Sequence, residues 1–101
     1  MGASAAQIGK LDEAVFAFQK AIRVEPDFAD TYSNLGNVLK DLGKPKEAVE
    51  AFNKAVSLNP DFAEAYFNKG NVLKDQIRLE EAIEAYKDAL SRKPNYAKVY
   101  N

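Results

Sequence analysis

The sequence predicts an all-α fold, a solenoid in which antiparallel helix pairs stack on one another. Residues 29–62 and 63–96 align without a gap, and 16 of their 34 positions are identical. Within each segment, apolar residues recur at the spacing of one helix face, and Gly and Pro interrupt that spacing at fixed places. Units that repeat at this period stack on their neighbours, because none of them buries its apolar face alone.

The spacing inside each segment resembles the tetratricopeptide repeat (TPR), a helix-turn-helix unit of the same period. The family pattern requires an aromatic residue, Leu-Gly, an apolar residue, Ala, a second aromatic residue, a second Ala and a closing Pro. The first segment supplies all of these with Tyr32, Leu35, Gly36, Leu39, Ala48, Phe52, Ala55 and Pro60. The second segment supplies most of them with Tyr66, Gly70, Leu73, Ala82, Tyr86, Ala89 and Pro94.

The second segment departs from the pattern at two positions. Lys69 stands where Leu is expected, and Ile77 stands where the first segment has Gly43. Because Gly adopts the left-handed conformation that ends a helix far more readily than Ile does, we expect the helix before Ile77 to end less sharply.

Partial units are expected at both ends of the array. Ala14, Phe18, Ala21 and Pro26 match the second half of a unit, and Ala97 and Tyr100 match the opening of another. The resemblance implies one TPR array over residues 1–101, a right-handed superhelical solenoid. It consists of a partial repeat (1–28), two full repeats (29–62 and 63–96) and the start of a further repeat (97–101).

The first part of the chain predicts an interrupted helix. We expect Gly9 to end a short helix over residues 1–8, and Leu11–Val24 to form the next helix. The apolar face of that second helix consists of Ala14, Val15, Phe18, Ala21 and Ile22. Pro26 lacks an N–H group and disfavours helical angles at the residue before it, so the helix ends upstream of Pro26.

Each full unit predicts two helices. Their approximate bounds are Ala29–Leu42 and Glu47–Leu58 in the first unit, and Ala63–Gln76 and Leu79–Arg92 in the second. Gly43 followed by Pro45 is typical of one helix ending and the next beginning. Gly36 costs its helix about 1 kcal/mol relative to Ala. We therefore expect the paired helix to approach closely at Gly36.

Composition limits the classes of function. The chain has 101 residues, of which 47% are hydrophobic, enough for one domain with a continuous core. Lys and Arg number 14 and Asp and Glu 15, a net charge of -1 that argues against nucleic acid as a partner. No apolar run approaches the roughly 18 residues of a membrane span, and residues 1–10 lack the pattern of a signal peptide. The expected location is cytoplasmic by default, without membrane association.

Catalytic chemistry has few residues to use. The chain contains no His and no Cys, which excludes Ser-His-Asp triads, Cys-His dyads and the common zinc sites. Pairs of acids can catalyse when their environments separate their pKa values, and such pairs occur at Asp12-Glu13, at Glu47 with Glu50, and at Glu80-Glu81 with Glu84. All of them fall on second helices at positions expected to face solvent. We expect no enzymatic activity, no cofactor and no metal site.

Polar residues form a stripe along the first helix of each full unit. They are Asn34, Asn37, Lys40 and Asp41 in the first unit, and Asn68, Asn71, Lys74 and Asp75 in the second. In a stacked array, residues one period apart take equivalent places on neighbouring helices, so the stripe forms ladders along one surface. The first helices of TPR arrays line a concave groove, so the resemblance implies a protein or peptide partner bound there.

Asparagine suits a groove that holds an extended peptide. One amide can donate to a backbone carbonyl and accept from a backbone N–H, whatever the side chains of the peptide are. The ladder resembles that of the TPR arm of the O-linked N-acetylglucosamine transferases, where Asn at the places of Asn34 and Asn68 holds substrate peptides. The alternative is that these residues satisfy neighbouring helix ends or keep the surface soluble.

Phe67 is the unusual member of the stripe, because its counterpart Ser33 is polar. It is a candidate anchor for a partner, or it packs on a further unit. Another TPR subclass binds the acidic carboxyl-terminal tails of chaperones through a clamp of Lys and Arg. The sequence departs from that pattern, since Ser33 and Phe67 stand where one clamp Lys would be and Glu64 stands where another would be.

Two alternatives to peptide binding in the groove follow from the sequence. The chain could be the non-catalytic, substrate-binding arm of a larger enzyme such as a glycosyltransferase. It could also be a self-assembling scaffold, because the Phe18 face and the Tyr86/Leu90 face lie at open ends of the array. A few hundred Å² of apolar area at each end would correspond to roughly 5–10 kcal/mol of burial at about 25 cal/mol per Å², enough to form a homo-oligomer.

Overall fold

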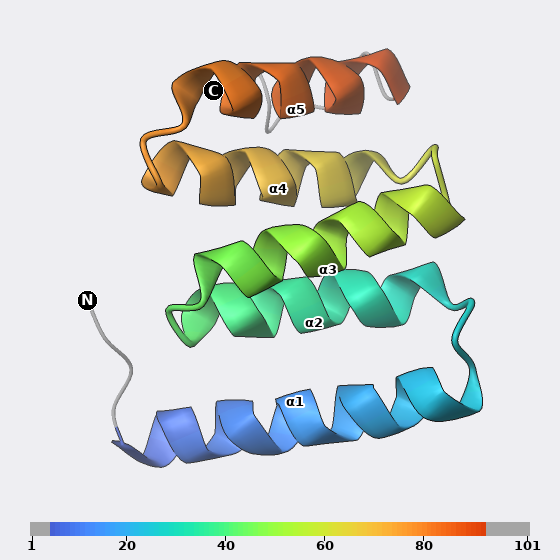
Figure 1. Cartoon of the computed structure of the whole chain (residues 1–101), viewed down its shortest axis with the longest axis vertical. Coiled ribbons are helices and arrows are strands. Elements are labelled where there is room, and N and C mark those ends of the chain that lie inside the picture. The colour runs from blue at the N-terminus through green and yellow to red at the C-terminus, as the bar shows by residue number, and fades with distance from the viewer. Residues whose placement is uncertain (1–4, 93–101) are drawn as a thin grey trace.

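The computed structural model describes residues 5–92, which form five α-helices. They are α1 (Ala5–Val24), α2 (Ala29–Asp41), α3 (Pro45–Leu58), α4 (Ala63–Asp75) and α5 (Leu79–Arg92). Successive helices run in opposite directions and form a stack that starts at α1 and ends at α5 (Figure 1). The described residues contain helices and no strands, which confirms the predicted all-α solenoid.

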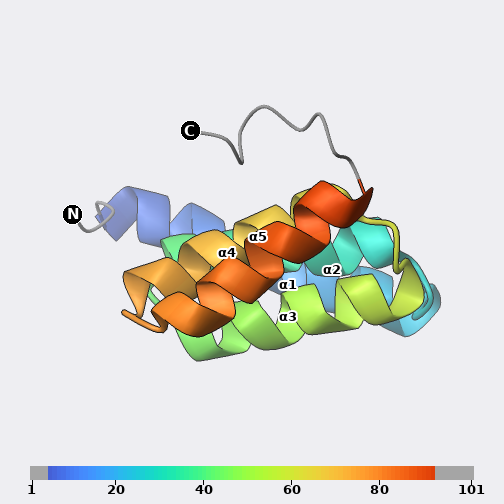
Figure 2. The same cartoon turned by 90° about the horizontal axis from the view of Figure 1, so that it is seen from above.

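Each helix packs mainly on its neighbours in the chain. α2 packs most extensively on α3, and α4 on α5, while α1 with α2 and α3 with α4 form the smaller contacts between successive pairs. α2 also touches α4 directly, so the first helices of the two full units lie next to each other. Seen from above, the helices lie over one another as a stack (Figure 2).

The core is made by the residues that carry the helical period. Its buried members come from α2 to α5, and Val15, Phe18 and Ile22 of α1 pack against it half-buried. Gly36 is needed at the centre, because a Cβ added to it would lie 2.7 Å from the Phe52 ring. The same relation holds between Gly70 and Tyr86, also at 2.7 Å. The expected close approach of the paired helix is therefore confirmed.

The structure corrects the prediction that the helix before Ile77 ends less sharply. Ile77 has φ 61°, close to the 77° of Gly43, and both residues adopt the left-handed conformation. In both units the N–H group after this residue donates to a carbonyl oxygen of the preceding helix at 2.9 Å. The packing of α4 along α5 imposes the turn, although the left-handed conformation strains the backbone of Ile77.

Gly9 does not end a helix, contrary to the prediction, since α1 continues through it from Ala5 to Val24. Gly43 and Ile77, its counterparts, each follow a 13-residue helix that packs along the next one and so stabilises the turn. A helix can continue through a glycine at a cost of only about 1 kcal/mol relative to Ala, so Gly9 alone does not oblige α1 to end.

The remaining helix bounds follow the prediction closely. α3 begins at Pro45, which occupies its first turn as expected. The predictions about residues 1–4, Pro94, Ala97 and Tyr100 lie outside the described residues. Among the helices of residues 5–92, none is long and apolar enough to cross a membrane.

Candidate peptide-binding surface

The nine predicted site residues lie on α2 and α4, and we call them the polar stripe. Four are on α2 (Asn34, Asn37, Lys40, Asp41) and five on α4 (Phe67, Asn68, Asn71, Lys74, Asp75). Asn34, Asp41, Lys74 and Asp75 are exposed, and the other five are half-buried. Because α2 and α4 touch, the two halves of the stripe lie on adjoining helices. The side chains can reach a partner, in contrast to Leu35, Leu39, Val72 and Leu73, which are buried.

The helical period separates the stripe from the core. On α2, Leu35 and Leu39 are buried in the core, whereas Asn34 and Asp41 are exposed and fall outside this arc. Ser33 is 2% exposed and therefore lies within the helix packing, whereas its counterpart Phe67 is half-buried. At this position the two units thus present different surfaces, since only the second has a side chain that reaches outwards.

Sequence analysis missed the contribution of Tyr86 to the stripe, because it gave this residue only as part of the family pattern and of an open end face. The Tyr86 hydroxyl donates to Asn71 Oδ1 at 2.6 Å. The rings of Phe67 and Tyr86 lie with their centroids 5.7 Å apart at 46°. Burial raises the pKa of Tyr86, and the charge of Asp75 raises it further. The replacement of Phe52 by Tyr86, which adds one hydroxyl at a core position, was the signal that could have revealed this contact.

The charges of the stripe balance within each unit. Lys40 is followed by Asp41 on α2, and Lys74 by Asp75 on α4. A surface with equal numbers of both charges does not attract a strongly acidic or basic partner over a distance. The residues that the structure describes contain no cluster of three or more acidic side chains that could hold a metal ion.

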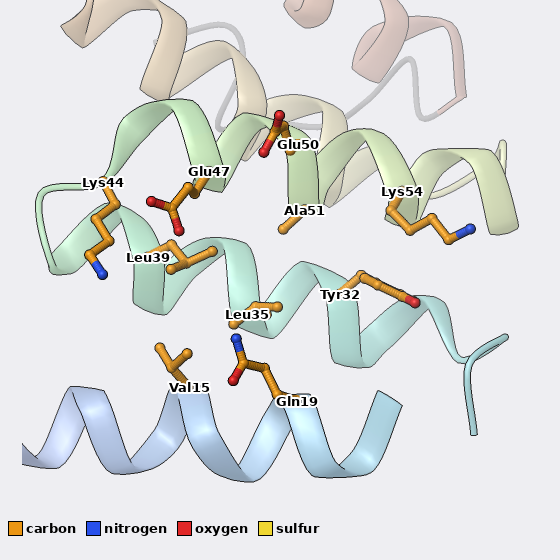
Figure 3. A pocket seen from close by; sticks show the side chains of 10 residues that line it. All are labelled: Val15, Gln19, Tyr32, Leu35, Leu39, Lys44, Glu47, Glu50, Ala51 and Lys54. Carbon is orange, nitrogen blue, oxygen red and sulfur yellow. The ribbon is translucent and has the colours of Figure 1, made fainter. Parts of the chain in front are cut away.

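Apart from the polar stripe, a hollow is lined by residues of α1, α2 and α3 (Figure 3). Its volume is about 340 Å³, and none of the nine stripe residues lines it. Val15, Leu35 and Leu39 form an apolar floor, and the carboxylates of Glu47 and Glu50, assigned to a solvated face from the sequence, lie exposed at its rim. Sequence analysis did not predict this hollow, because it gave Leu35 and Leu39 only as members of the family pattern.

Stacked antiparallel helix pairs with an accessible polar stripe define a helical-repeat protein, a class whose members bind other proteins through extended surfaces. The family comparison makes the class specific. The tetratricopeptide repeat family matches residues 33–97, and a further TPR family matches residues 4–43. The chain belongs to the tetratricopeptide repeat family, whose domains are generally non-catalytic protein-interaction modules.

Solved structures of other TPR proteins are similar to this chain. The crystal structure of MamA is 33% identical with a TM-score of 0.83, and the alignment covers 91% of this chain and 54% of that one. This chain therefore spans about half the length of MamA. The first TPR of Spaghetti (RPAP3), bound to the HSP90 peptide SRMEEVD, is 30% identical with a TM-score of 0.87, covering 92% and 74%.

The first TPR domain of human RPAP3, solved by NMR, gives the same identity of 30% and TM-score of 0.87, and 73% of it is covered. No curated protein sequence matched the chain. A neighbour that binds a peptide supports a protein or peptide partner for this fold. The function at the level of the family is therefore protein interaction.

Proposed function

We propose that the polar stripe binds an extended peptide segment of a partner protein in the groove lined by the first helices of the repeats. The observation that carries this proposal is the ladder itself. Four polar residues of α2 recur on α4 one repeat later, and the two helices touch. A peptide laid across α2 and α4 would meet the same side chains at regular intervals.

Asparagine amides would make the sequence-independent contacts. Asn34 and Asn68 would donate to peptide carbonyl oxygens and accept from peptide N–H groups, and each such contact contributes roughly 0.5–1.5 kcal/mol. The Lys and Asp residues of the stripe would pair with charges of the partner. Phe67 would hold an apolar side chain, although its ring already contacts Tyr86.

The Asn34/Asn68 pair is also the basis for the likeness to the arm of the O-linked N-acetylglucosamine transferases. In this second candidate, the chain is the substrate-binding arm of a larger enzyme, with partial repeats at 1–28 and 97–101 on either side of full repeats at 29–62 and 63–96. The gene sequence beyond residue 101 tests it, because the candidate requires a catalytic domain in the same protein.

The peptide of the RPAP3 neighbour is expected to bind weakly. SRMEEVD is acidic, and the clamp position that calls for Lys holds the buried Ser33 in one unit and Phe67 in the other. Asp75 and Glu64 are exposed and add negative charge to α4. This peptide is a suitable test of charge selectivity, and tight binding would show that the groove follows the chaperone-tail subclass instead.

Selection from a phage-displayed library of 12-residue peptides tests the main proposal. We expect the unmodified chain to recover peptides whose affinity falls roughly tenfold in an Asn34→Ala/Asn68→Ala variant, as two lost hydrogen bonds would cause. Asn53→Ala/Ser57→Ala, on the exposed side of α3, is the matched control and should bind normally. Equal binding by the two variants would place the peptide elsewhere and overturn the proposal.

Self-assembly is the third candidate, and the exposure of α5 favours it. Ile83 is 53% exposed, whereas its counterpart Val49 is 9% exposed under α4. If α5 stacks on another copy, light scattering should show a mass that rises with concentration in the unmodified chain and stays monomeric in an Ile83→Lys variant. A monomer at every concentration would remove this candidate.

A further inference from the structure

Tyr86 is held in a fixed place beside the polar stripe. Its ring packs over Gly70, where an added Cβ would lie 2.7 Å from Cε1. The hydroxyl at the end of that ring donates to Asn71 Oδ1 at 2.6 Å, from α5 to α4. This short bond joins the core to a residue whose side chain is half-buried at the surface.

The first unit has the same ring packing without the hydroxyl. Phe52 is fully buried and lies against Gly36 in the same way. Asn37 stands at the place of Asn71. Since a phenyl ring cannot donate a hydrogen bond, Phe52 does not determine how the Asn37 amide is turned.

We propose that Tyr86 is a positioning residue that fixes the Asn71 amide, because it occupies one acceptor site of Oδ1 and leaves the Nδ2 amino group to donate to a partner. The second unit would then favour a peptide carbonyl oxygen over an N–H group at Asn71, while Asn37 could take either. The proposal rests on peptide binding by the polar stripe, and it adds which group of the peptide binds at Asn71. A fixed donor in one unit selects a carbonyl oxygen of the peptide at that place.

The surroundings indicate a neutral carbonyl rather than a carboxylate. Asp75 is close enough to Tyr86 for its charge to raise the phenol pKa, and Phe67 packs on the same ring. Asp75 disfavours a carboxylate at Asn71, and Lys74 next to it balances this charge, so the charges there do not select a carboxylate over a neutral carbonyl. A backbone carbonyl next to an apolar side chain fits both neighbours, since the side chain could rest on Phe67.

The direction of the hydrogen bond between Tyr86 and Asn71 can be measured without any peptide. In Tyr86→Phe, the Asn71 ¹³Cγ NMR signal should shift because its oxygen loses a donor, while the ¹⁵Nδ2 signal stays nearly unchanged. Phe52→Tyr is the matched variant, and it should move the Asn37 ¹³Cγ signal. If the ¹⁵Nδ2 signal of Asn71 shifts instead, the hydroxyl accepts from the amino group and the proposal is wrong.

The effect on binding is measured with a peptide recovered from the phage library and blocked at both ends. Tyr86→Phe should weaken its binding roughly threefold to tenfold, the size of one disturbed hydrogen bond. In an Asn71→Ala background, Tyr86→Phe should change the affinity by less than about 1.5-fold, because Tyr86 acts through Asn71. Equal weakening in both backgrounds would mean that Tyr86 acts through the fold or contacts the peptide itself.

Asn71→Asp separates donor from acceptor, because the carboxylate still accepts from Tyr86 but has no amino group. We expect this variant to weaken binding as much as Asn71→Ala does, and an affinity equal to that of the unmodified chain would overturn the proposal. Failure of the groove itself is distinguished by Asn34→Ala/Asn68→Ala. If that variant binds normally, peptide binding by the stripe is wrong, and the NMR experiment still decides the polarity of Asn71.

Discussion

The first unit (α2 and α3) and the second unit (α4 and α5) share a sequence pattern but differ in what covers them. Val49 of α3 is buried because α4 packs on it, and Ile83 at the same position of α5 is mostly exposed. The residue type is equally apolar in both. Burial in this array is therefore determined by the next unit and not by the residue alone.

The units also differ in how they cover the aromatic residue that opens each first helix. In the second unit the Arg92 guanidinium lies 4.6 Å from the Tyr66 ring centroid and its Nε donates to Pro60 O at 2.6 Å. In the first unit Leu58 stands at the place of Arg92, and the cation over the opening aromatic residue is Lys54, whose Nζ lies 5.9 Å from the Tyr32 ring centroid at the hollow of Figure 3. The second unit thus holds its opening aromatic residue more closely than the first.

Replacing the central aromatic residue of each unit should have the largest effect on stability, and the effect should differ between the units. Phe52→Ala leaves a cavity at a fully buried site, and we expect the free energy of unfolding to fall by about 3–5 kcal/mol. Tyr86→Ala should cost less, about 2–3 kcal/mol, because the ring is half-buried and water can enter. Urea unfolding followed by circular dichroism measures both, and a larger loss at Tyr86 would contradict the difference in burial.

Filling the two glycine contacts should have a smaller effect. An Ala at Gly36 must displace the Phe52 ring, and overpacking of this kind costs about 1–3 kcal/mol, partly offset by the better helix propensity of Ala. Gly70→Ala should be milder, since the Tyr86 ring can move towards solvent. The midpoint of urea unfolding compares the two, and equal or reversed losses would show that Phe52 yields as easily as Tyr86.

At the turn inside each unit, the substitution in the second unit should stabilise the chain and the substitution in the first unit should destabilise it. Ile77 is 77% exposed and has φ 61°, so Ile77→Gly removes strain at little cost in burial. We expect it to stabilise the chain by about 1 kcal/mol. Gly43→Ala is the control and should destabilise the chain by a similar amount, measured by thermal unfolding. If Ile77→Gly lowers the midpoint, contacts of the Ile side chain outweigh its backbone strain.

The sequence predicted the features that depend on the spacing of apolar residues and on the positions of Gly and Pro. The helices from α2 to α5 begin and end within about two residues of their predicted bounds, because Gly43, Pro45 and the apolar spacing act locally. The close approach at Gly36 was also predicted. The placement of the polar stripe on first helices followed from the repeat, but its binding role stays a prediction.

What escaped prediction depends on packing between elements. α1 runs through Gly9 although Gly43, at the same position of the next unit, follows the end of α2, and Ile77 adopts the left-handed turn because α4 and α5 pack along each other. Neither outcome is encoded in the residue itself. The Tyr86 bond to Asn71 joins residues 15 apart on different helices, and only the stack brings them together.

The smallest expected difference concerns the start of α5. Arg78 Nη2 lies 2.6 Å from Glu81 Oε2, and its hydrogen bonds hold the pKa of Glu81 below 4.5, the ordinary value. A carboxylate with a lowered folded-state pKa adds stability above its unfolded-state pKa, and that stability is lost as the pH falls through the folded-state value. Both side chains are largely exposed, so the effect should be small and should weaken with salt.

Glu81→Gln should therefore unfold at a slightly lower urea concentration than the unmodified chain at pH 7, and the difference should shrink as the pH falls below about 4.5. Glu47→Gln in the first unit is the control, because it makes the same change beside Lys44 instead of Arg78. Arg holds a carboxylate in a planar, two-point contact that Lys cannot make, so the control should change the urea midpoint less at pH 7. A Glu81→Gln difference that persists unchanged at pH 3 would mean that the side chain stabilises α5 by a route other than its charge.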